Sequence, residues 1–363
     1  MIYLYLLAFI AALVMVYMLT PLVKKFAVRI GAVDVPNHRK VHTKIMPRLG
    51  GLAIYLAFMG TFFIMFPLLQ EYDKNAAWGI LVGGSVIVLI GALDDRFELS
   101  AKIKLLGQLA AAAIVVIGFD LQVEFVNLPF GSVFAMYDME WLSIILTILW
   151  IVGVTNAINL IDGLDGLAAG VSGIAIATTM VLAFMMGNVM VILLCAALLG
   201  SVIGFLFFNF HPAKIFMGDS GALFLGFSLA VLSILGFKTA TLASFIVPIM
   251  ILGVPISDTV FAIIRRIVNK KPISSADKNH LHHRLQELGL SHRNTVLVIY
   301  GISCIFGVCA IVLSQSELWL TIIVTAIVVV ALEIGAEAIG LISKSKQPIL
   351  GLLRRLQVKL KEL

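Results

Sequence analysis

The sequence contains few charged residues for its length. Aspartate, glutamate, lysine and arginine together make up 13% of the 363 residues, whereas an average soluble domain carries roughly 25%. Hydrophobic residues make up 61%, against roughly 45–50% in soluble domains. This composition excludes a soluble globular protein and a disordered chain, and it predicts an integral membrane protein.

Cysteine is scarce as well. The chain has three cysteines, Cys195, Cys304 and Cys309, and all of them lie in apolar runs. An odd number of cysteines in such surroundings predicts neither a disulfide framework nor a thiolate metal site. The first apolar run starts at Ile2 without a basic segment before it, so we expect a retained membrane span rather than a cleaved signal.

Long apolar runs dominate the chain and predict an all-α polytopic membrane protein. The ninth run contains Pro248, Gly253 and Pro255, so we expect this helix to be kinked or broken. Residues 1–342 would form a single transmembrane catalytic domain. Residues 343–363 form a basic tail that either lies on an anionic leaflet as a short helix or is solvated. The eleven predicted spans are 2–23, 50–69, 77–93, 103–118, 141–158, 165–186, 188–208, 221–236, 239–264, 294–313 and 317–342.

The basic residues indicate how the chain is oriented. With eleven spans, 24 of the 26 lysines and arginines fall in one set of loops, and only Lys74 and Lys238 fall in the other. Positive residues mark the cytoplasmic side. We therefore predict that the N-terminus faces outward and the C-terminus faces the cytoplasm. All seven histidines and the aspartates of the polar segments lie on the cytoplasmic side in this arrangement.

Two adjacent aspartates end the third predicted span. Asp94 and Asp95 stand at the edge of the hydrocarbon, where an unpaired carboxylate is costly. Neighbouring carboxylates repel each other, so either a cation lies between them or one has a raised pKa. Lys102 and Lys104 open the next span and could neutralise the pair or bind phosphate. The alternative is a simple acidic helix end.

A dense polar segment, NAINLIDGLDGLAAG, joins the fifth and sixth predicted spans. Its polar residues recur every three positions, at Asn156, Asn159, Asp162 and Asp165. On an unbroken helix the first and last of them would point in opposite directions. Because a glycine follows each aspartate, we expect the helix to break and the polar groups to converge. Aspartate supplies the hard oxygen that Mg²⁺ prefers. The alternative is an ordinary polar loop.

The segment FNFHPAKIFMGDSG joins the seventh and eighth predicted spans. Asp219 and Ser220 stand where the next helix begins, and both are good N-capping residues. The free N–H groups of a helix N-terminus also favour phosphate, and Asp219 could carry a metal ion beside it. Other side chains here suit a nucleotide: the donors Asn209, His211 and Lys214, and Phe216, which could stack on a planar base.

The last polar segment follows the broken ninth span. Asp258 lies seven residues, about two helical turns, before Arg265, so we expect it to orient this arginine. As an alternative, Arg265 and Arg266 are a positive-inside anchor. Three histidines follow in a loop rich in lysine and arginine, at His280, His282 and His283. They could bind zinc, but no cysteine accompanies them, and donation to a diphosphate is more natural.

Together these segments resemble the polyprenyl-phosphate N-acetylhexosamine-1-phosphate transferases, a family of integral membrane enzymes. The resemblance rests on VHTKIMPRLGG, the aspartate pair with KLLGQ, NAINLIDGLDGLA, FNFHPAKIFMGDSG, and RR followed by HLHH, in order over residues 42–283. It is closest to the branch that uses UDP-N-acetylglucosamine. The branch that uses UDP-N-acetylmuramoyl-pentapeptide usually has three consecutive histidines, whereas Leu281 separates His280 from His282 here.

The resemblance implies a reaction and its partners. N-acetylglucosamine 1-phosphate would pass from UDP-N-acetylglucosamine to undecaprenyl phosphate, giving undecaprenyl-diphospho-N-acetylglucosamine and UMP. This would be the first membrane step of an envelope glycopolymer such as teichoic acid. The resemblance also implies Mg²⁺ as the cofactor, with Mn²⁺ as a substitute, the lipid bilayer as the environment and a homodimer as the assembly. We expect no nucleic acid partner.

The motifs and the resemblance together give four groups of predicted site residues. The catalytic group contains Asp94, Asp95, Lys104, Asp162 and Asp165. The metal ligands are Asp219 and Asn156. The nucleotide-binding group contains Asn159, Asn209 and Phe216. The diphosphate- and sugar-binding group contains Lys214, Arg265, His280, His282 and His283.

Two other functions stay open at this point. One is a phospho-N-acetylmuramoyl-pentapeptide transferase. The other is a proton-coupled secondary transporter, which would place ionisable groups near the bilayer midplane, where only Asp258, Glu333 and Glu337 are expected. The mechanism is open too: either the lipid phosphate attacks directly, or Asp94 or Asp95 acts as a covalent nucleophile.

Overall fold

The computed structural model of the chain describes residues 2–35, 45–69, 75–122, 125–127, 133–135, 140–236, 243–272, 277 and 279–341. The predicted tail at 343–363 lies outside the described residues, as do the first four residues, 41–44, of the VHTKIMPRLGG segment.

Among the residues that the structure describes, the first half of the chain forms seven helical segments and two short strand pairs. The helices are α1 (Ile2–Ile30), α2 (Gly50–Met65), the 3₁₀ helix η1 (Phe66–Leu69), α3 (Asn75–Phe97), α4 (Ala101–Ala113), the π-helix η2 (Ile114–Gly118) and α5 (Glu140–Ile161). Strands β1 (Val33–Asp34) and β2 (Met46–Pro47) pair antiparallel, as do β3 (Phe125–Asn127) and β4 (Val133–Ala135).

In the second half, the described residues form eight helices joined by short connections. The helices are α6 (Leu167–Met185), α7 (Val189–Asn209), α8 (Gly218–Gly236), α9 (Ala243–Ile251), α10 (Gly253–Val268), α11 (Leu281–Glu287), α12 (His292–Ser314) and α13 (Leu318–Ala338). The predicted break in the ninth span falls at Leu252, between α9 and α10.

The structure confirms the predicted fold class, an all-α polytopic membrane protein. In the described part of the chain, nine helices are long and apolar enough to cross a membrane. Each remaining predicted span coincides with a shorter helix: α2, which has 16 residues, and the broken pair α9–α10. The count of eleven spans and their orientation stay predictions.

Several helices extend beyond the apolar runs that predicted them. α1 continues to Ile30, and α10 continues to Val268. On α1 the buried face persists through Val23 and Ala27, although Lys24 and Lys25 interrupt the apolar run. Charged residues at the last turns can point away from the bundle, so the end of an apolar run is not the end of its helix.

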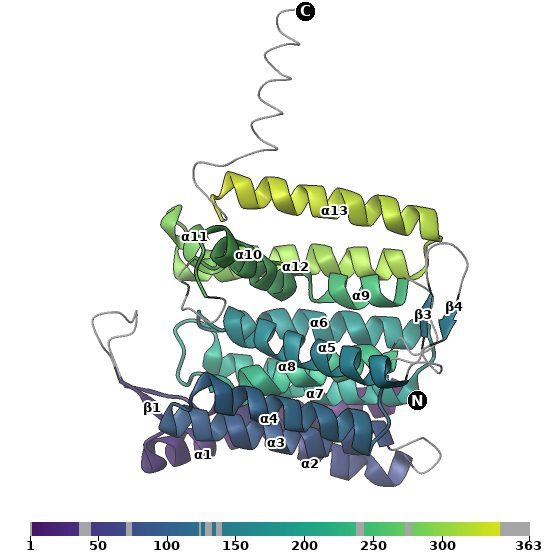
Figure 1. The fold of residues 1–363 in the computed structure, drawn as a ribbon. Coiled ribbons are helices and arrows are strands. Elements are labelled where there is room, and N and C mark those ends of the chain that lie inside the picture. The colour runs from purple at the N-terminus through teal and green to yellow at the C-terminus, as the bar shows by residue number, and fades with distance from the viewer. Residues whose placement is uncertain are drawn as a thin grey trace, which may run out of the picture.

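The helices pack in layers, with the most buried helices at the centre (Figure 1). In both α7 and α8, 83% of the most apolar stretch is buried inside the protein, against 11% in α13. Figure 1 shows α1 and α13 at opposite sides of the bundle. It also shows β1 and α11 at one end, and the N-terminus and the β3–β4 pair at the other.

Glycines allow the start of α8 to lie against two other helices. A Cβ added at Gly51 on α2 would collide with the backbone of Gly221, and one added at Gly91 on α3 would collide with the backbone of Ser220. The backbones of α2 and α3 therefore touch the first turn of α8. This close approach brings the end of α3, which carries Asp94 and Asp95, beside Asp219.

Candidate active site

The end of α3 and the start of α8 meet around a lysine from α4. The Lys104 ammonium donates to Asp219 Oδ2 at 2.9 Å and to Asp94 Oδ2 at 3.4 Å. The carboxyl groups of Asp94 and Asp219 also lie within hydrogen-bonding reach of each other. Asp94 Oδ1 is buried and has no hydrogen-bond partner among the described residues. We call Asp94, Lys104 and Asp219 the Asp–Lys cluster.

Asp95 caps the N-terminus of α8. Its Oδ1 accepts from the Asp219 N–H at 2.8 Å, and its Oδ2 accepts from the N–H and the hydroxyl of Ser220 at 3.1 and 2.8 Å. These are the free donors and the positive dipole end of the helix. This 4% exposed carboxylate therefore holds Asp219 in place, and a catalytic role of Asp95 stays a prediction.

The α5–α6 connection breaks where the glycines predicted. Asn159, on the last turns of α5, forms a side-chain hydrogen bond with Asp219. Asp162 follows in the loop and is half-buried. Burial, with the negative charges of Asp219 and Asp95 adding to it, raises the pKa of Asp162 to about 8, while the Arg48 charge opposes this. The Asp162 carboxyl therefore lies near the Asp–Lys cluster.

Asn156 lies outside the Asp–Lys cluster. Its Nδ2 donates to Gln108 Oε1 at 2.6 Å and to the Val152 carbonyl at 2.8 Å, and its Oδ1 accepts from Gln108 Nε2 at 3.3 Å. The Asn156 amide oxygen thus has a partner within the protein, and its role as a metal ligand stays a prediction. The reciprocal pair ties α5 to α4, one turn after Lys104.

Asp165 joins the α5–α6 loop to the loop before α8. Its Oδ2 accepts from the Ala213 N–H at 3.1 Å and lies 2.9 Å from His211 Nδ1. Its N–H donates to His292 Nε2 at 3.0 Å, and the rings of His211 and His292 stack with centroids 4.3 Å apart. Asp165 thus clamps the two loops together, and its catalytic role stays a prediction.

The predicted nucleotide-binding residues lie around the loop before α8. Asn209 is buried; its Oδ1 accepts from the Gly166 N–H at 3.1 Å and its Nδ2 donates to the Ile215 carbonyl at 3.0 Å. Its amide therefore joins the two loops, and contact with a nucleotide stays a prediction. Phe216 is half-buried. The exposed Lys214 places its ammonium 5.9 Å from the centre of the Phe208 ring.

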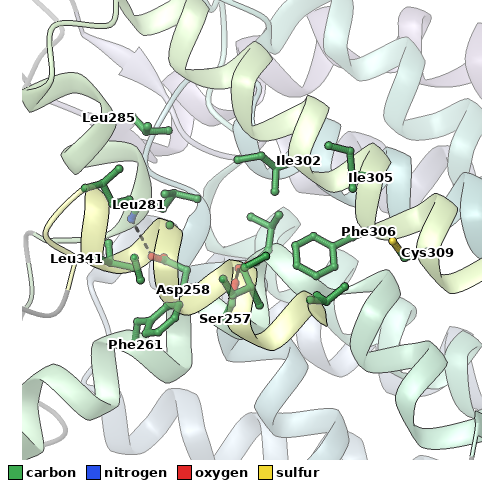
Figure 2. Close-up of a pocket in the computed structure, with 17 residues that line it drawn as sticks. Ser257, Asp258, Phe261, Leu281, Leu285, Ile302, Ile305, Phe306, Cys309 and Leu341 are labelled. Atoms are coloured by element: carbon green, nitrogen blue, oxygen red, sulfur yellow. Dashed lines mark hydrogen bonds between the residues drawn. The ribbon is translucent and has the colours of Figure 1, made fainter. Parts of the chain in front are cut away.

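Asp258 orients the first histidine of the HLHH segment rather than Arg265. Asp258 Oδ2 lies 2.7 Å from His280 Nδ1, and Oδ1 accepts from the Leu281 N–H at 2.8 Å. Figure 2 shows this second bond at the start of α11. The predicted partnership of Asp258 with Arg265 is wrong. Asp258 instead holds the start of α11 against α10.

His282 reaches the loop that carries Asp162. A Cβ added at Gly163 would collide with the His282 ring, so glycine is required for this contact. The histidine is 2% exposed, and its Nδ1 has no hydrogen-bond partner among the described residues. Burial, and next the nearby His283, lower the pKa of His282 to about 3. His282 is therefore a neutral donor or acceptor at physiological pH.

Arg265 is buried in an internal network. Its Nε donates to Asp277 Oδ2 at 2.9 Å, and its Nη1 donates to the Leu341 carbonyl at 2.6 Å. Burial alone would raise the pKa of Asp277, but the Arg265 hydrogen bonds outweigh it and lower the pKa. The arginine thus joins α10, the histidine loop and the residues after α13, and binding of the diphosphate by Arg265 stays a prediction.

Comparisons with known proteins identify the family. A family model described as "Glycosyl transferase family 4" matches residues 77–237. The chain is 49% identical to the probable undecaprenyl-phosphate N-acetylglucosaminyl 1-phosphate transferase of Bacillus subtilis, over 96% of each chain. The chain belongs to glycosyl transferase family 4.

More distant members of glycosyl transferase family 4 are similar over most of their length. The decaprenyl-phosphate N-acetylglucosaminephosphotransferase of Mycobacterium tuberculosis is 36% identical over 80% of this chain and 77% of its own. The undecaprenyl-phosphate alpha-N-acetylglucosaminyl 1-phosphate transferase of Salmonella typhi is 26% identical over 77% and 75%. The resemblance stated from the motifs is confirmed, and the protein is a membrane-bound glycosyl transferase.

The Asp–Lys cluster has the donor set that a hard divalent cation needs. Two carboxylates approach each other, and one buried oxygen, Asp94 Oδ1, has no partner among the described residues. Oxygen ligands of this kind suit Mg²⁺. The ligand atoms of Asp165, His211 and His292 also lie within 4.8 Å of one another, but those of Asp165 and His292 are already engaged in hydrogen bonds. That clamp needs no metal.

An apolar cavity of about 340 Å³ lies beside the histidine loop, between α10, α11, α12 and α13. Figure 2 shows Phe306, Ile302 and Phe261 around it, with Asp258 and Ser257 as its acidic and hydroxyl side chains. Asp258 therefore connects the wall of this cavity to His280.

Sequence reasoning in this glycosyl transferase missed three residues. Gln108 pairs with Asn156, and His292 accepts from the Asp165 N–H. The positive charge of Arg48 opposes the rise in the pKa of Asp162. Gln108 lies one turn after Lys104, in the KLLGQ match, and this spacing places both on one face of α4. The other two lie far along the chain from their partners, and no local pattern pairs them.

Proposed function

We propose that this protein transfers N-acetylglucosamine 1-phosphate from UDP-N-acetylglucosamine to undecaprenyl phosphate. The names of the relatives support this reaction. The observation that supports it most directly is the α5–α6 loop, in which Gly163 contacts the ring of the neutral His282 and the adjacent Asp162 lies near the Asp–Lys cluster. Acidic ligands and histidine donors thus flank one place, as a cation-assisted diphosphate reaction needs.

In the proposed reaction an oxygen of the lipid phosphate forms a bond to the β-phosphorus of the sugar nucleotide. The bond from that phosphorus to the oxygen bridging it to the α-phosphate breaks, and UMP leaves. Much of a phosphate monoester is already dianionic at pH 7, because its second pKa is about 6. The attacking group therefore needs positioning more than it needs a strong base.

Two anions must approach each other in this reaction, and the chain's residues reduce their repulsion. Lys104 brings a positive charge to the cluster, and His282 can donate without adding charge. We propose that Asp94 and Asp219 hold Mg²⁺, for which Mn²⁺ would substitute. When bound, this ion would neutralise charge on the diphosphate and on the leaving UMP.

Direct attack is favoured over a covalent route through Asp95. Both oxygens of Asp95 accept hydrogen bonds from the first residues of α8, and a nucleophile bound in this way would have to leave its helix. Asp94 is the remaining covalent candidate. Mixing the enzyme with UDP-N-acetylglucosamine alone decides between the routes. We expect no burst of UMP, and a burst that matches the amount of enzyme would establish the covalent route.

Transfer of radiolabel tests the proposed function. Membranes containing the protein should convert labelled UDP-N-acetylglucosamine into a product soluble in organic solvent only when undecaprenyl phosphate is added. Asp219→Asn should abolish this transfer. Asp120→Asn, at an exposed residue beyond η2, is the matched control and should leave transfer intact. Transfer from UDP-N-acetylmuramoyl-pentapeptide instead would overturn the proposed sugar nucleotide.

The cellular arrangement is also proposed. Residues 1–342 would form one catalytic domain in the bacterial plasma membrane, with the active site facing the cytoplasm and residues 343–363 as a cytoplasmic tail. The product would enter an envelope polymer such as teichoic acid. The homodimer is checked by the mass of the purified complex in detergent. The family assignment leaves no support for the secondary transporter.

A further inference from the structure

The segment before α2 forms a backbone ladder with the loop that carries Phe216. The Phe216 N–H donates to the Pro47 carbonyl at 2.9 Å, and the Phe216 carbonyl accepts from the Gly50 N–H at 3.0 Å. The Gly51 N–H donates to the Met217 carbonyl at 2.9 Å. Arg48 is bridged to Phe216 in parallel fashion within this ladder. The backbone of Arg48 is therefore fixed beside Phe216, which lies three residues before Asp219 in the chain.

The positive charge of Arg48 also acts on a residue of the site. That residue is Asp162, which lies in the α5–α6 loop beside the Asp–Lys cluster. Phe216 and Asp162 come from different parts of the chain. Arg48 is bridged to Phe216 through its backbone and affects Asp162 through its charge. Arg48 is thus joined through its backbone to the loop of Phe216, whose ring is predicted to stack on the nucleotide base, and its charge acts on an acidic residue predicted to act on the diphosphate.

Two basic residues that the sequence assigned to the site already have partners among the described residues. Lys104 donates to both Asp94 and Asp219, and the buried Arg265 is held by Asp277 and Leu341. The half-buried Arg48 guanidinium forms no hydrogen bond with any residue that the structure describes. An arginine whose charge acts on Asp162 without a hydrogen bond to it has donors available for another anion.

We propose that Arg48 binds the diphosphate of the sugar nucleotide, between Phe216 and the Asp–Lys cluster. This inference rests on the proposed function. The planar guanidinium can donate two parallel hydrogen bonds to phosphate oxygens. It offsets the repulsion that the nearby carboxylates exert on a phosphate anion, and the ladder with the Phe216 loop sets its distance from the nucleoside. Arg48 would thereby bind the anionic diphosphate of the nucleotide, whereas Phe216 would bind its base.

Binding of UDP and of uridine to the full-length protein in detergent separates these two roles. In Arg48→Gln we expect the Kd for UDP to rise about tenfold or more, since charge-assisted hydrogen bonds are lost, while the Kd for uridine stays within about twofold. Arg29→Gln, at an exposed arginine on the last turn of α1, is the matched control and should bind both as the wild type does. Unchanged UDP affinity, or an equal loss for uridine, would overturn the proposal.

A second measurement uses the wild-type protein and does not depend on the variant folding. Phenylglyoxal modifies accessible arginines, and mass spectrometry follows the modification of Arg48. UDP should slow it several-fold, whereas uridine and a polyprenyl phosphate should not. Equal rates with and without UDP would refute the proposal, and protection by the polyprenyl phosphate alone would assign Arg48 to the lipid substrate. If the protein binds UDP but transfers no sugar phosphate, the proposed function fails while Arg48 is still judged by these data.

Discussion

Two adjacent aspartates at the end of α3 have different surroundings, and these separate their roles. Asp94 faces Lys104 and keeps one buried oxygen without a partner among the described residues. Asp95 accepts hydrogen bonds from the backbone at the start of α8. Asp95 therefore determines where Asp219 lies, while Asp94 remains able to act on a ligand. A substitution at either position would abolish activity, so only structural measurements can distinguish them.

At the residue scale, the buried His282 makes stability depend on pH. Its pKa is about 3 in the folded protein and about 6.5 in an unfolded chain. Between these values the unfolded chain binds a proton that the folded protein lacks, so stability rises with pH and falls on acidification. From pH 6.5 to pH 5 we expect a loss of about 2 kcal/mol. Reversible unfolding in mixed micelles, measured from pH 5 to 7.5, checks this.

The variant His282→Gln isolates this contribution. It removes the titrating group, so its stability should fall less steeply below pH 6.5 than that of the wild type, while the difference between the two proteins should be constant above pH 7. Parallel curves over the whole range would show that His282 takes up its proton equally well in the folded and unfolded states.

The sequence predicted which residues gather at the site better than it predicted what each one contacts. Motif spacing brought Asp94, Asp162 and Asp219 to one place, because helix ends and glycine breaks are local features. It did not predict the side chains that Asn156 and Arg265 contact. Their partners, Gln108 and Asp277, are set by how helices pack and by a loop path, and neither is encoded in the spacing of a motif.

At the scale of the elements, the site depends on how closely α3 and α8 approach. The long apolar runs predicted that these helices form. The contact between their backbones, however, depends on single glycines within those runs. Gly91 has no distinctive context in the sequence, yet the structure places it against the Ser220 backbone. In membranes, such small residues let helices approach more closely than other side chains allow.

We predict that Gly91→Ala separates α3 from α8. The added methyl group would overlap backbone atoms of Ser220, which cannot move aside as a flexible side chain can. The hydrogen bonds from Asp219 and Ser220 to Asp95 should lengthen, and the Asp–Lys cluster should open. We expect a lower melting temperature and at least a tenfold loss of transferase activity, measured on protein purified in detergent.

Gly153→Ala on α5 is the matched control for this substitution. A Cβ at Gly153 meets no atom within 4 Å, and alanine favours a helix over glycine by about 0.5–1 kcal/mol. This variant should be as stable as the wild type or slightly more so, with unchanged activity. If Gly91→Ala behaved in the same way, close contact between α3 and α8 would not be what positions the aspartates.

At the scale of the whole molecule, the polar chemistry lies at one end of the bundle. Asp94, at the end of α3, meets Lys104 at the start of α4 and Asp219 at the start of α8. Figure 1 shows α11 and β1 at one end and the β3–β4 pair at the other. With eleven spans, 24 lysines and arginines fall in the loops of one side and two in those of the other, which agrees with one end facing the cytoplasm. This orientation depends on the number of spans.

Two single cysteines on either side of α12 test the orientation directly. Glu317 lies in the loop before α13, and Lys271 lies beyond the end of α10; both are exposed. In a background with the three native cysteines changed to alanine, a membrane-impermeant maleimide should label Glu317→Cys in intact cells. Lys271→Cys should react only after the membrane is permeabilised, because the basic loops do not cross the bilayer readily.

The possible outcomes of this labelling carry distinct consequences for the proposed function. The reverse pattern would place the Asp–Lys cluster outside the cell, where a nucleotide sugar made in the cytoplasm cannot reach it. Labelling of both positions in intact cells would mean that α12 does not cross the membrane, and the predicted count of eleven spans would then be wrong. The expected pattern would place the histidine loop beside the cytoplasm, on the side from which a charged, soluble donor must arrive.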